Sequence, residues 1–240
     1  MTSALSLEGQ LNSTERKYIF ESVLELAPKN PVCIEVGTFK GGGSTLQILQ
    51  ALAQSDGVLF GVEACPRIFE EMKAALQSRE PELYQHFFPL CGFSQKVIPA
   101  LIHEGRLSRV DFAFLDGGNN PREQITEFKL LDPIMPVGST LMAHDILLRK
   151  GKWLRRFLPL LDHYETRILP ISSEGLLVAK KMALQPTLGA KAKAWLVVFM
   201  SELAPLELIS QLIPSWLCSF ILKMLPRKFS AWAAEGRPLH

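Results

Sequence analysis

Continuous apolar runs alternate along the chain with segments in which apolar residues recur at helical spacing. Five of the runs are bounded by turn-forming residues and predict buried strands. These runs are PVCIEVG, GVLFGVEA, HFFPLCG, RVDFAFLDGG and GSTLMAHDI, at residues 31–37, 57–64, 86–92, 109–118 and 138–146. The segments between them predict helices at about 44–54, from Pro66 onward, at 94–102 and at about 121–134. Strands that alternate with helices are typical of a parallel sheet with helices on both faces.

Two further strand-like runs close this pattern. YETRILPI and GLLVAKK, at residues 164–171 and 175–181, follow a predicted helix at 152–161 and leave little room for another helix between them. Such spacing predicts an antiparallel hairpin at one edge of the sheet. Another helix, capped by Asn12, Ser13 or Thr14, is expected before the first strand. The predicted fold class is therefore α/β, a doubly wound, mostly parallel seven-stranded sheet with a C-terminal antiparallel hairpin.

The character of the sequence changes near Ala183. Beyond this point six lysines and arginines face three acids. The longest uncharged run there, 208–222, is interrupted by Pro214, and it is shorter than the roughly 20 residues that cross a bilayer. We expect one α/β domain at residues 1–182 and an apolar helical extension at 183–240. The basic residues and tryptophans of segment 191–228 suit contact with a membrane surface, packing on the α/β domain or formation of a homodimer.

Composition and charge narrow the classes of function. An apolar share of 48% supports a packed core, and a net charge of +2 without a basic run in the first 180 residues argues against nucleic acid as a partner. The four cysteines show no CxxC pairing, so we expect reduced core thiols. The first residues lack the pattern of a secretory signal. These features favour a cytoplasmic protein, with peripheral membrane contact as the alternative that the extension leaves open.

The stretch CIEVGTFKGGGST, residues 33–45, ends a strand in a glycine-rich turn and then opens a helix. A phosphate-binding P-loop requires Gly-Lys directly before the Ser or Thr, whereas Gly43 precedes Ser44 here. A dinucleotide fingerprint that starts at Gly37 would need glycine where Phe39 stands. NAD-linked oxidoreduction on a related fold therefore remains only as an alternative. The turn is suited to close approach of the backbone to a different nucleoside ligand.

Several motifs occur in an order that resembles the class I S-adenosylmethionine-dependent methyltransferases. Within them the sequence is similar to the O-methyltransferase branch, which includes the catechol and caffeoyl-coenzyme A enzymes and related small-molecule methyltransferases. The motifs are IEVGTFKGGGST, GVEA, PLCGFS, DFAFLDGGN, GSTLMAHDI and GLLVAKK, spread over roughly residues 29–181. The resemblance implies that residues 1–182 bind S-adenosylmethionine and that the protein methylates a hydroxyl group of a small-molecule acceptor.

The resemblance also implies a set of cofactor-binding residues. Glu63 ends the second strand, and one carboxylate there can accept hydrogen bonds from both ribose hydroxyls. Glu35 lies in an apolar strand and needs partners, which we expect to be backbone donors of the glycine turn or the amino group of the cofactor. The turn after the third strand is where the family holds the adenine. The full set is Glu35, Gly37, Thr38, Gly41, Ser44, Glu63, Gly92, Phe93, Ser94 and Asp116.

The resemblance places the reaction at Asp116, after the fourth strand, and at His144 and Asp145, after the fifth. Part of the branch deprotonates the acceptor on Mg²⁺ or another divalent metal, for which Asp116, Asp145 and Asn119 would supply oxygen ligands. The catechol-type enzymes have an acid at the position of His144 and a lysine at that of Asn119. His144 can instead serve as a general base without a metal, because its ordinary pKa of about 6.5 suits neutral pH. Both mechanisms stay open, as does a non-catalytic cofactor-binding or scaffolding protein.

Overall fold

The computed structural model describes residues 7–202 of the chain. The chain divides into two compact units, Met1–Trp195 and Leu196–His240, and of the second unit only residues 196–202 are described. Most of the expected extension at 183–240, and of its segment 191–228, therefore lies outside the described residues. No helix within residues 7–202 is long and apolar enough to cross a membrane.

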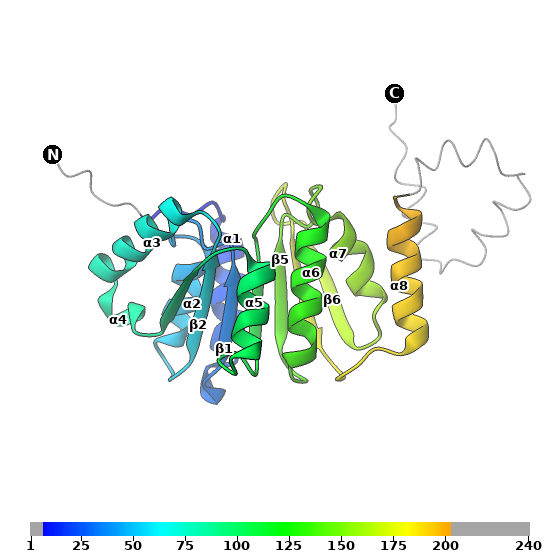
Figure 1. Cartoon of the computed structure of the whole chain (residues 1–240), viewed down its shortest axis with the longest axis horizontal. Helices are drawn as coiled ribbons and strands as arrows, with labels where there is room; N and C mark the ends of the chain where they lie inside the picture. The colour runs from blue at the N-terminus through cyan, green and yellow to red at the C-terminus, as the bar shows by residue number, and fades with distance from the viewer. Residues whose placement is uncertain (1–6, 203–240) are drawn as a thin grey trace, which may run out of the picture. The chain divides into compact units, whose positions relative to one another are not determined.

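A seven-stranded sheet forms the centre of the first unit (Figure 1). Its strands follow the order β3-β2-β1-β4-β5-β7-β6. Strands β1 to β5 pair in parallel, and β7 pairs antiparallel with both β5 and β6. The strands are β1 Val32–Val36, β2 Val58–Glu63, β3 Phe87–Cys91, β4 Phe112–Leu115, β5 Thr140–His144, β6 Tyr164–Leu169 and β7 Leu176–Lys181. The predicted α/β class, with its mostly parallel sheet and terminal hairpin, is confirmed.

The last strand in sequence lies inside the sheet, and β6 forms its edge. Burial patterns explain this arrangement. Leu176, Leu177 and Ala179 of β7 are fully buried, as suits a strand that is paired on both sides. Residues Glu165 and Arg167 of β6 are not buried and form an ion pair, and charges of this kind protect an exposed edge from further strand pairing.

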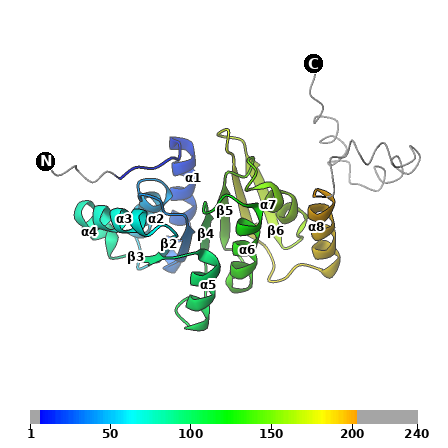
Figure 2. The ribbon, with the colours of Figure 1, turned by 45° about the horizontal axis from the view of Figure 1, so that its top comes forward.

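Helices cover both faces of the sheet (Figures 1 and 2). Helices α1 and α2 lie together on one face, and α5, α6 and α7 lie side by side on the other. Their bounds, with those of the remaining helices, are α1 Ser13–Leu24, α2 Ser44–Leu52, α3 Pro66–Arg79, α4 Pro81–Tyr84, α5 Ser94–His103, α6 Pro121–Leu131, α7 Lys152–Phe157 and α8 Leu188–Met200, with 3₁₀ turns at Ala27–Lys29, Asp132–Ile134 and Leu158–Leu160.

Capping residues explain the starts of helices α1 and α6, and proline explains why α6 and α7 end earlier than predicted. Asn12 is the N-cap of α1 and Asn120 that of α6, each in a reciprocal capping box. Helix α6 ends at Leu131 rather than near residue 134, and α7 ends at Phe157 rather than near residue 161. A 3₁₀ turn that contains a proline follows each of them, because proline cannot donate the hydrogen bond that would continue the helix.

The direction of strand order reverses at β1, which lies between β2 and β4. In open α/β sheets such a reversal opens a crevice at the carboxyl ends of the strands, where ligands bind.

The cysteines that the structure describes do not form a group at this crevice. Cys33 is a buried free thiol as expected, but Cys91 is exposed at the end of β3, so the prediction of a core thiol is wrong there. Cys218 lies outside the described residues.

Candidate active site

A cavity of about 320 Å³ opens at the carboxyl ends of the parallel strands. It brings together residues that are far apart in the sequence, among them Gly37 after β1, Glu63 at the end of β2 and Asp116 after β4. Eight residues of the predicted cofactor, catalytic and metal sets line it, namely Gly37, Glu63, Gly92, Phe93, Ser94, Asp116, Asn119 and Asp145. The cavity therefore contains both predicted cofactor-binding residues and predicted catalytic or metal-binding residues, which lie far apart in the sequence.

The backbone at Gly37 lies against the turn after β4. Gly37 has a φ of +89°, and a Cβ at this position would lie 2.8 Å from both the carbonyl carbon of Asp116 and the nitrogen of Gly117. Only glycine fits this close approach without moving the backbone of the neighbouring turn. The glycine thus allows the first and fourth loops of the sheet to meet at the cavity.

Glu63 is held in place by backbone donors. Its Oε2 accepts a hydrogen bond from the N–H of Phe39 at 2.9 Å, and its Oε1 accepts one from the N–H of Cys65 at 2.9 Å. Each carboxylate oxygen can accept more than one hydrogen bond. The oriented carboxylate, 9% exposed and on the wall of the cavity, is suited to bind a pair of neighbouring hydroxyls.

Four residues of the predicted cofactor set lie outside the cavity lining: Glu35, Thr38, Gly41 and Ser44. Glu35 is fully buried and accepts a hydrogen bond from the Ser44 hydroxyl at its Oε1, so its partner is a side chain and not the expected backbone donor. Gly41 has a φ of +79°, and its α-carbon faces Met72 and Leu76 of α3. These residues therefore support the glycine turn on the side that does not line the cavity.

Burial gives Glu35 a testable pH dependence. Burial, opposed by the hydrogen bond from Ser44, raises the pKa of Glu35 from its ordinary 4.5 to about 8. Between these values the folded protein keeps a proton that the unfolded chain releases, so stability falls as pH rises through this window. Glu35→Gln keeps an acceptor for Ser44 and cannot ionise. Its melting temperature should exceed that of the wild type by roughly 5 °C at pH 9 and match it at pH 5, and melting curves that stay parallel across this range would contradict the assignment.

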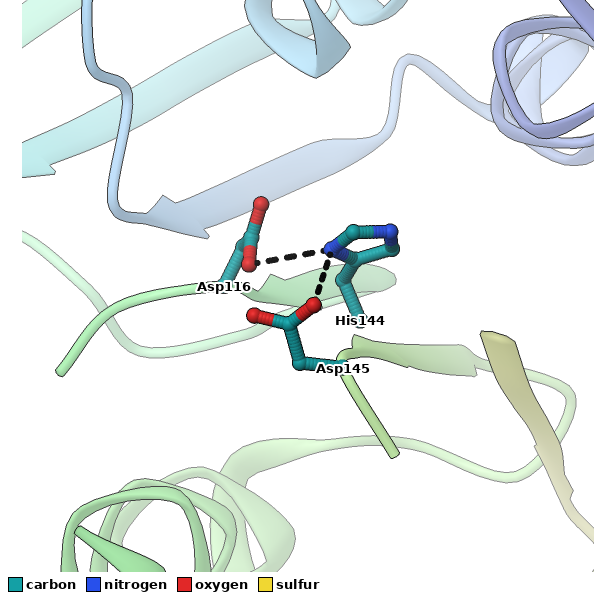
Figure 3. A group of neighbouring side chains, drawn as sticks. All are labelled: Asp116, His144 and Asp145. Carbon is teal, nitrogen blue, oxygen red and sulfur yellow. Dashed lines mark ion pairs between the residues drawn. The ribbon is translucent and has the colours of Figure 1, made fainter. Parts of the chain in front are cut away.

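A cluster of charged side chains forms the other end of the cavity. His144 Nδ1 lies 3.3 Å from Asp116 Oδ1 and 3.3 Å from Asp145 Oδ1 (Figure 3). On the opposite side of the ring, His144 Nε2 lies 3.2 Å from Oε1 of Glu15 in α1. Lys150 Nζ lies 2.8 Å from Asp116 Oδ1 and 2.7 Å from Asp145 Oδ2. The two aspartates thus share two nitrogen-bearing partners.

The surrounding carboxylates favour the charged forms of both partners. Burial lowers the pKa of His144, but Asp116, Asp145 and Glu15 outweigh it, so that the pKa is raised. Burial likewise lowers the pKa of Lys150, and the same two aspartates raise it above its ordinary value. Both ring nitrogens of His144 face carboxylates, and the imidazole is not part of the cavity wall. This geometry suits His144 to orient the aspartates and does not favour direct proton transfer between His144 and an acceptor.

Lys150 is the main residue of the site that no sequence motif predicted. It is 7% exposed and lines the cavity, and a tight loop after β5 returns it to Asp145. Asp145 has a φ of +56°, and a Cβ at Gly151 would lie 2.4 Å from the α-carbon of Ile146. One feature of the sequence pointed to such a residue. The catechol-type enzymes have a lysine at the position of Asn119, and its absence here allows a lysine from another part of the chain to supply the positive charge.

The segment before α1 lies across the glycine turn. The N–H of Gly42 donates to the carbonyl of Glu8 at 3.0 Å, and Lys40 forms an ion pair with the Glu8 carboxylate at 2.8 Å. Gln10, which follows, lines the cavity. No sequence motif predicts that these residues lie at the site, because only the folded chain brings them to the turn.

The predicted divalent metal does not fit the charged cluster as it is arranged. Donor atoms of Asp116, His144 and Asp145 lie within 4.8 Å of one another. However, the ammonium of Lys150 already binds both aspartates, and its positive charge would repel a metal ion there. Both ring nitrogens of His144 already face carboxylates, so a metal ion would have to displace one of these contacts to bind the imidazole. Asn119, the third predicted ligand, is an exposed residue whose N–H donates to Glu123 Oε2 at 2.9 Å.

Comparison with known proteins agrees with this geometry. Residues 34–146 match the model of a family described as a methyltransferase domain. An O-methyltransferase from Bacillus cereus, solved with SAH, is 18% identical and has a TM-score of 0.57 over 73% of this chain and 84% of that one. The O-methyltransferase TomG from Streptomyces achromogenes, solved with SAM, is 17% identical and has a TM-score of 0.58 over 72% of this chain and 82% of that one. No curated protein matches the sequence.

Identities of this size establish the fold, while the family match covers the strands and loops that build the cavity. The matched segment runs from β1 to the residue after Asp145. It therefore includes the glycine turn, Glu63 and both aspartates of the charged cluster. The resemblance to the class I S-adenosylmethionine-dependent methyltransferases is confirmed.

Proposed function

From a methyltransferase domain over residues 34–146, we propose that this protein transfers a methyl group from S-adenosylmethionine to a hydroxyl of a small molecule. The observation that carries the proposal is the single cavity that Gly37, Glu63, Asp116, Asp145 and Lys150 line together. Gly37 and Glu63 would bind the nucleoside, and the charged side chains of Asp116, Asp145 and Lys150 would take part in proton transfer. A non-catalytic binding protein would have no need of the second.

The cavity wall suggests how the cofactor is held. The backbone of the Gly37 turn allows close approach, and Glu63 would accept hydrogen bonds from the ribose hydroxyls. The turn of Gly92, Phe93 and Ser94 after β3 would face the adenine. When bound, S-adenosylmethionine supplies a methyl group that its positively charged sulfur activates. The binding task of the protein is then to orient the acceptor oxygen toward that methyl carbon.

The charged cluster would prepare the acceptor. A hydroxyl must lose its proton as the bond to the methyl carbon forms, and Asp145 or Asp116 at the cavity wall can accept that proton. Lys150 stays protonated between them and would stabilise the negative charge that develops on the acceptor oxygen. His144, fixed by Glu15, would keep the two aspartates in position. The proposed chemistry uses side chains of the chain itself for the role that a divalent metal has in the catechol-type enzymes.

Calorimetry with S-adenosylhomocysteine and with NAD tests the proposal. Wild-type protein should bind the homocysteine nucleoside at micromolar concentrations and show no heat with NAD, because the glycine turn lacks the spacing of a dinucleotide fingerprint. Release of S-adenosylhomocysteine from S-adenosylmethionine, measured with a panel of phenols and aliphatic alcohols, should then identify an acceptor class. Binding of NAD without binding of the homocysteine nucleoside would replace the proposal with the oxidoreductase alternative.

A further inference from the structure

Helix α6 carries a buried carboxylate, Glu127, on the wall of the cavity. Glu127 is 1% exposed. Its Oε1 accepts hydrogen bonds from the Ser94 hydroxyl at 2.6 Å and from the Gln95 side-chain amide at 3.3 Å. Its other oxygen, Oε2, is buried and has no hydrogen-bond partner among the described residues. Within the described residues, only one of the two carboxylate oxygens of Glu127 is therefore hydrogen-bonded.

An unpaired buried oxygen of this kind points to a missing donor. Buried polar atoms are almost always hydrogen-bonded, and those that are not call for a specific explanation. Burial, with a contribution from Glu123, raises the pKa of Glu127 to about 7 even though Ser94 and Lys150 act in the other direction. The protein alone thus stabilises the charged form only weakly. Because Glu127 lines the cavity, a bound molecule can supply the missing N–H donor.

The position of Glu127 in the cavity indicates which hydrogen-bond donor of a bound ligand would reach its Oε2. This step rests on the proposed function, in which the ligand is S-adenosylmethionine. The partners of Oε1, Ser94 and Gln95, begin α5 directly after the turn of Gly92 and Phe93. Phe93 is 62% exposed and borders the cavity, so its ring offers an apolar surface for a flat base. The donor next to this turn would be the amino group of the adenine.

We propose that Glu127 Oε2 accepts a hydrogen bond from the 6-amino group of adenine and makes the protein select adenine over a 6-oxopurine. A 6-oxopurine presents a carbonyl oxygen at that place. Two acceptors would then face each other, and neither would be satisfied within a buried site. Ser94 and Gln95 act as positioning residues, because they hold the other carboxylate oxygen and so orient Oε2.

Calorimetry with two ligands tests this inference. Wild-type protein should bind S-adenosylhomocysteine at least tenfold more tightly than S-inosylhomocysteine, which differs at the 6-position of the base. Glu127→Gln can keep its amide oxygen on Ser94 and Gln95 and turn its NH₂ group toward the cavity. The variant should lose roughly 10- to 100-fold in affinity for the adenosyl ligand, while its affinity for the inosyl ligand is unchanged or higher. The preference should thus be abolished or reversed.

Glu165→Gln is the control. Glu165 lies on β6, is exposed and forms an ion pair with Arg167, and it does not line the cavity. Its variant should keep the preference of the wild type. Equal affinity of the wild type for both ligands would overturn the inference without any variant, and so would a Glu127→Gln protein that keeps the full adenosyl preference. Failure of the wild type to bind S-adenosylhomocysteine would instead overturn the proposed function and this inference with it.

Discussion

Replacement of Lys150 by methionine should reduce methyl transfer by about 10²- to 10³-fold, which is the usual loss when one group that stabilises a developing oxyanion is removed. Lys150 Nζ lies within 2.8 Å of both Asp116 and Asp145, and it is the lysine of the cavity wall. Without it the charge on the acceptor oxygen has no nearby lysine to stabilise it, while the binding residues around Gly37 and Glu63 are untouched. The turnover number should therefore fall, and the affinity for S-adenosylhomocysteine should change by less than about threefold.

Two variants and a chelator make this prediction specific. Lys96→Met removes an exposed lysine of α5 that does not line the cavity, and it should keep full activity. Lys150→Arg keeps a positive charge beside both aspartates and should retain more activity than Lys150→Met, and melting curves of both variants identify a loss that comes only from unfolding. Wild-type turnover should not change when a chelator is added. Loss of turnover with chelator, restored by Mg²⁺, would show that a metal and not Lys150 supplies the positive charge.

Gly37→Ala should abolish detectable binding of S-adenosylhomocysteine and destabilise the domain by about 2 to 4 kcal/mol, since a strained φ and a backbone clash add. The Cβ would lie 2.8 Å from the backbone of Asp116 and of Gly117. To admit it, the turns after β1 and β4 must separate, and these turns form adjoining walls of the cavity. Denaturant unfolding and calorimetry measure the two effects.

Gly138→Ala separates the two causes. Gly138 has the same φ of +89°, but a Cβ there would have no atom within 4 Å. Its variant should lose only about 1 to 2 kcal/mol, which is the cost of a left-handed backbone conformation for a residue with a Cβ, and should bind the nucleoside normally. Comparable losses in both variants would mean that contact between the two turns does not matter for the site.

The strand pattern and the glycine turn could be predicted because their causes are local. A strand, a turn with glycines and a capped helix follow one another within residues 32–52, and each is encoded by its own residues. The same holds for the capping boxes of α1 and α6. The antiparallel hairpin was also predictable, because little chain separates its two strands. Its order in the sheet was not, since both strands could have formed the edge.

The direction of individual side chains was harder to predict. Glu35 was expected to face the turn or the cofactor, yet it bonds to Ser44 at the start of the next helix. His144 was one of two candidates for activating the acceptor, as a general base in place of a metal, and Glu15 of α1 lies against its outer nitrogen. Each of these partners comes from an element whose placement depends on packing, and hydrophobic periodicity does not specify which polar groups meet.

The amino-acid sequence by itself determined the class of fold, the run of parallel strands and the presence of acidic groups and glycines at their carboxyl ends, because these properties follow from neighbouring residues. Only the tertiary structure decided which cation serves the two aspartates and which carboxylate lacks a partner. Lys150 reaches Asp116 through a loop that folds back after β5, and Glu127 meets Ser94 where α5 and α6 pack together. Contacts between distant segments depend on the whole arrangement of the sheet and its helices, and no stretch of sequence encodes them alone.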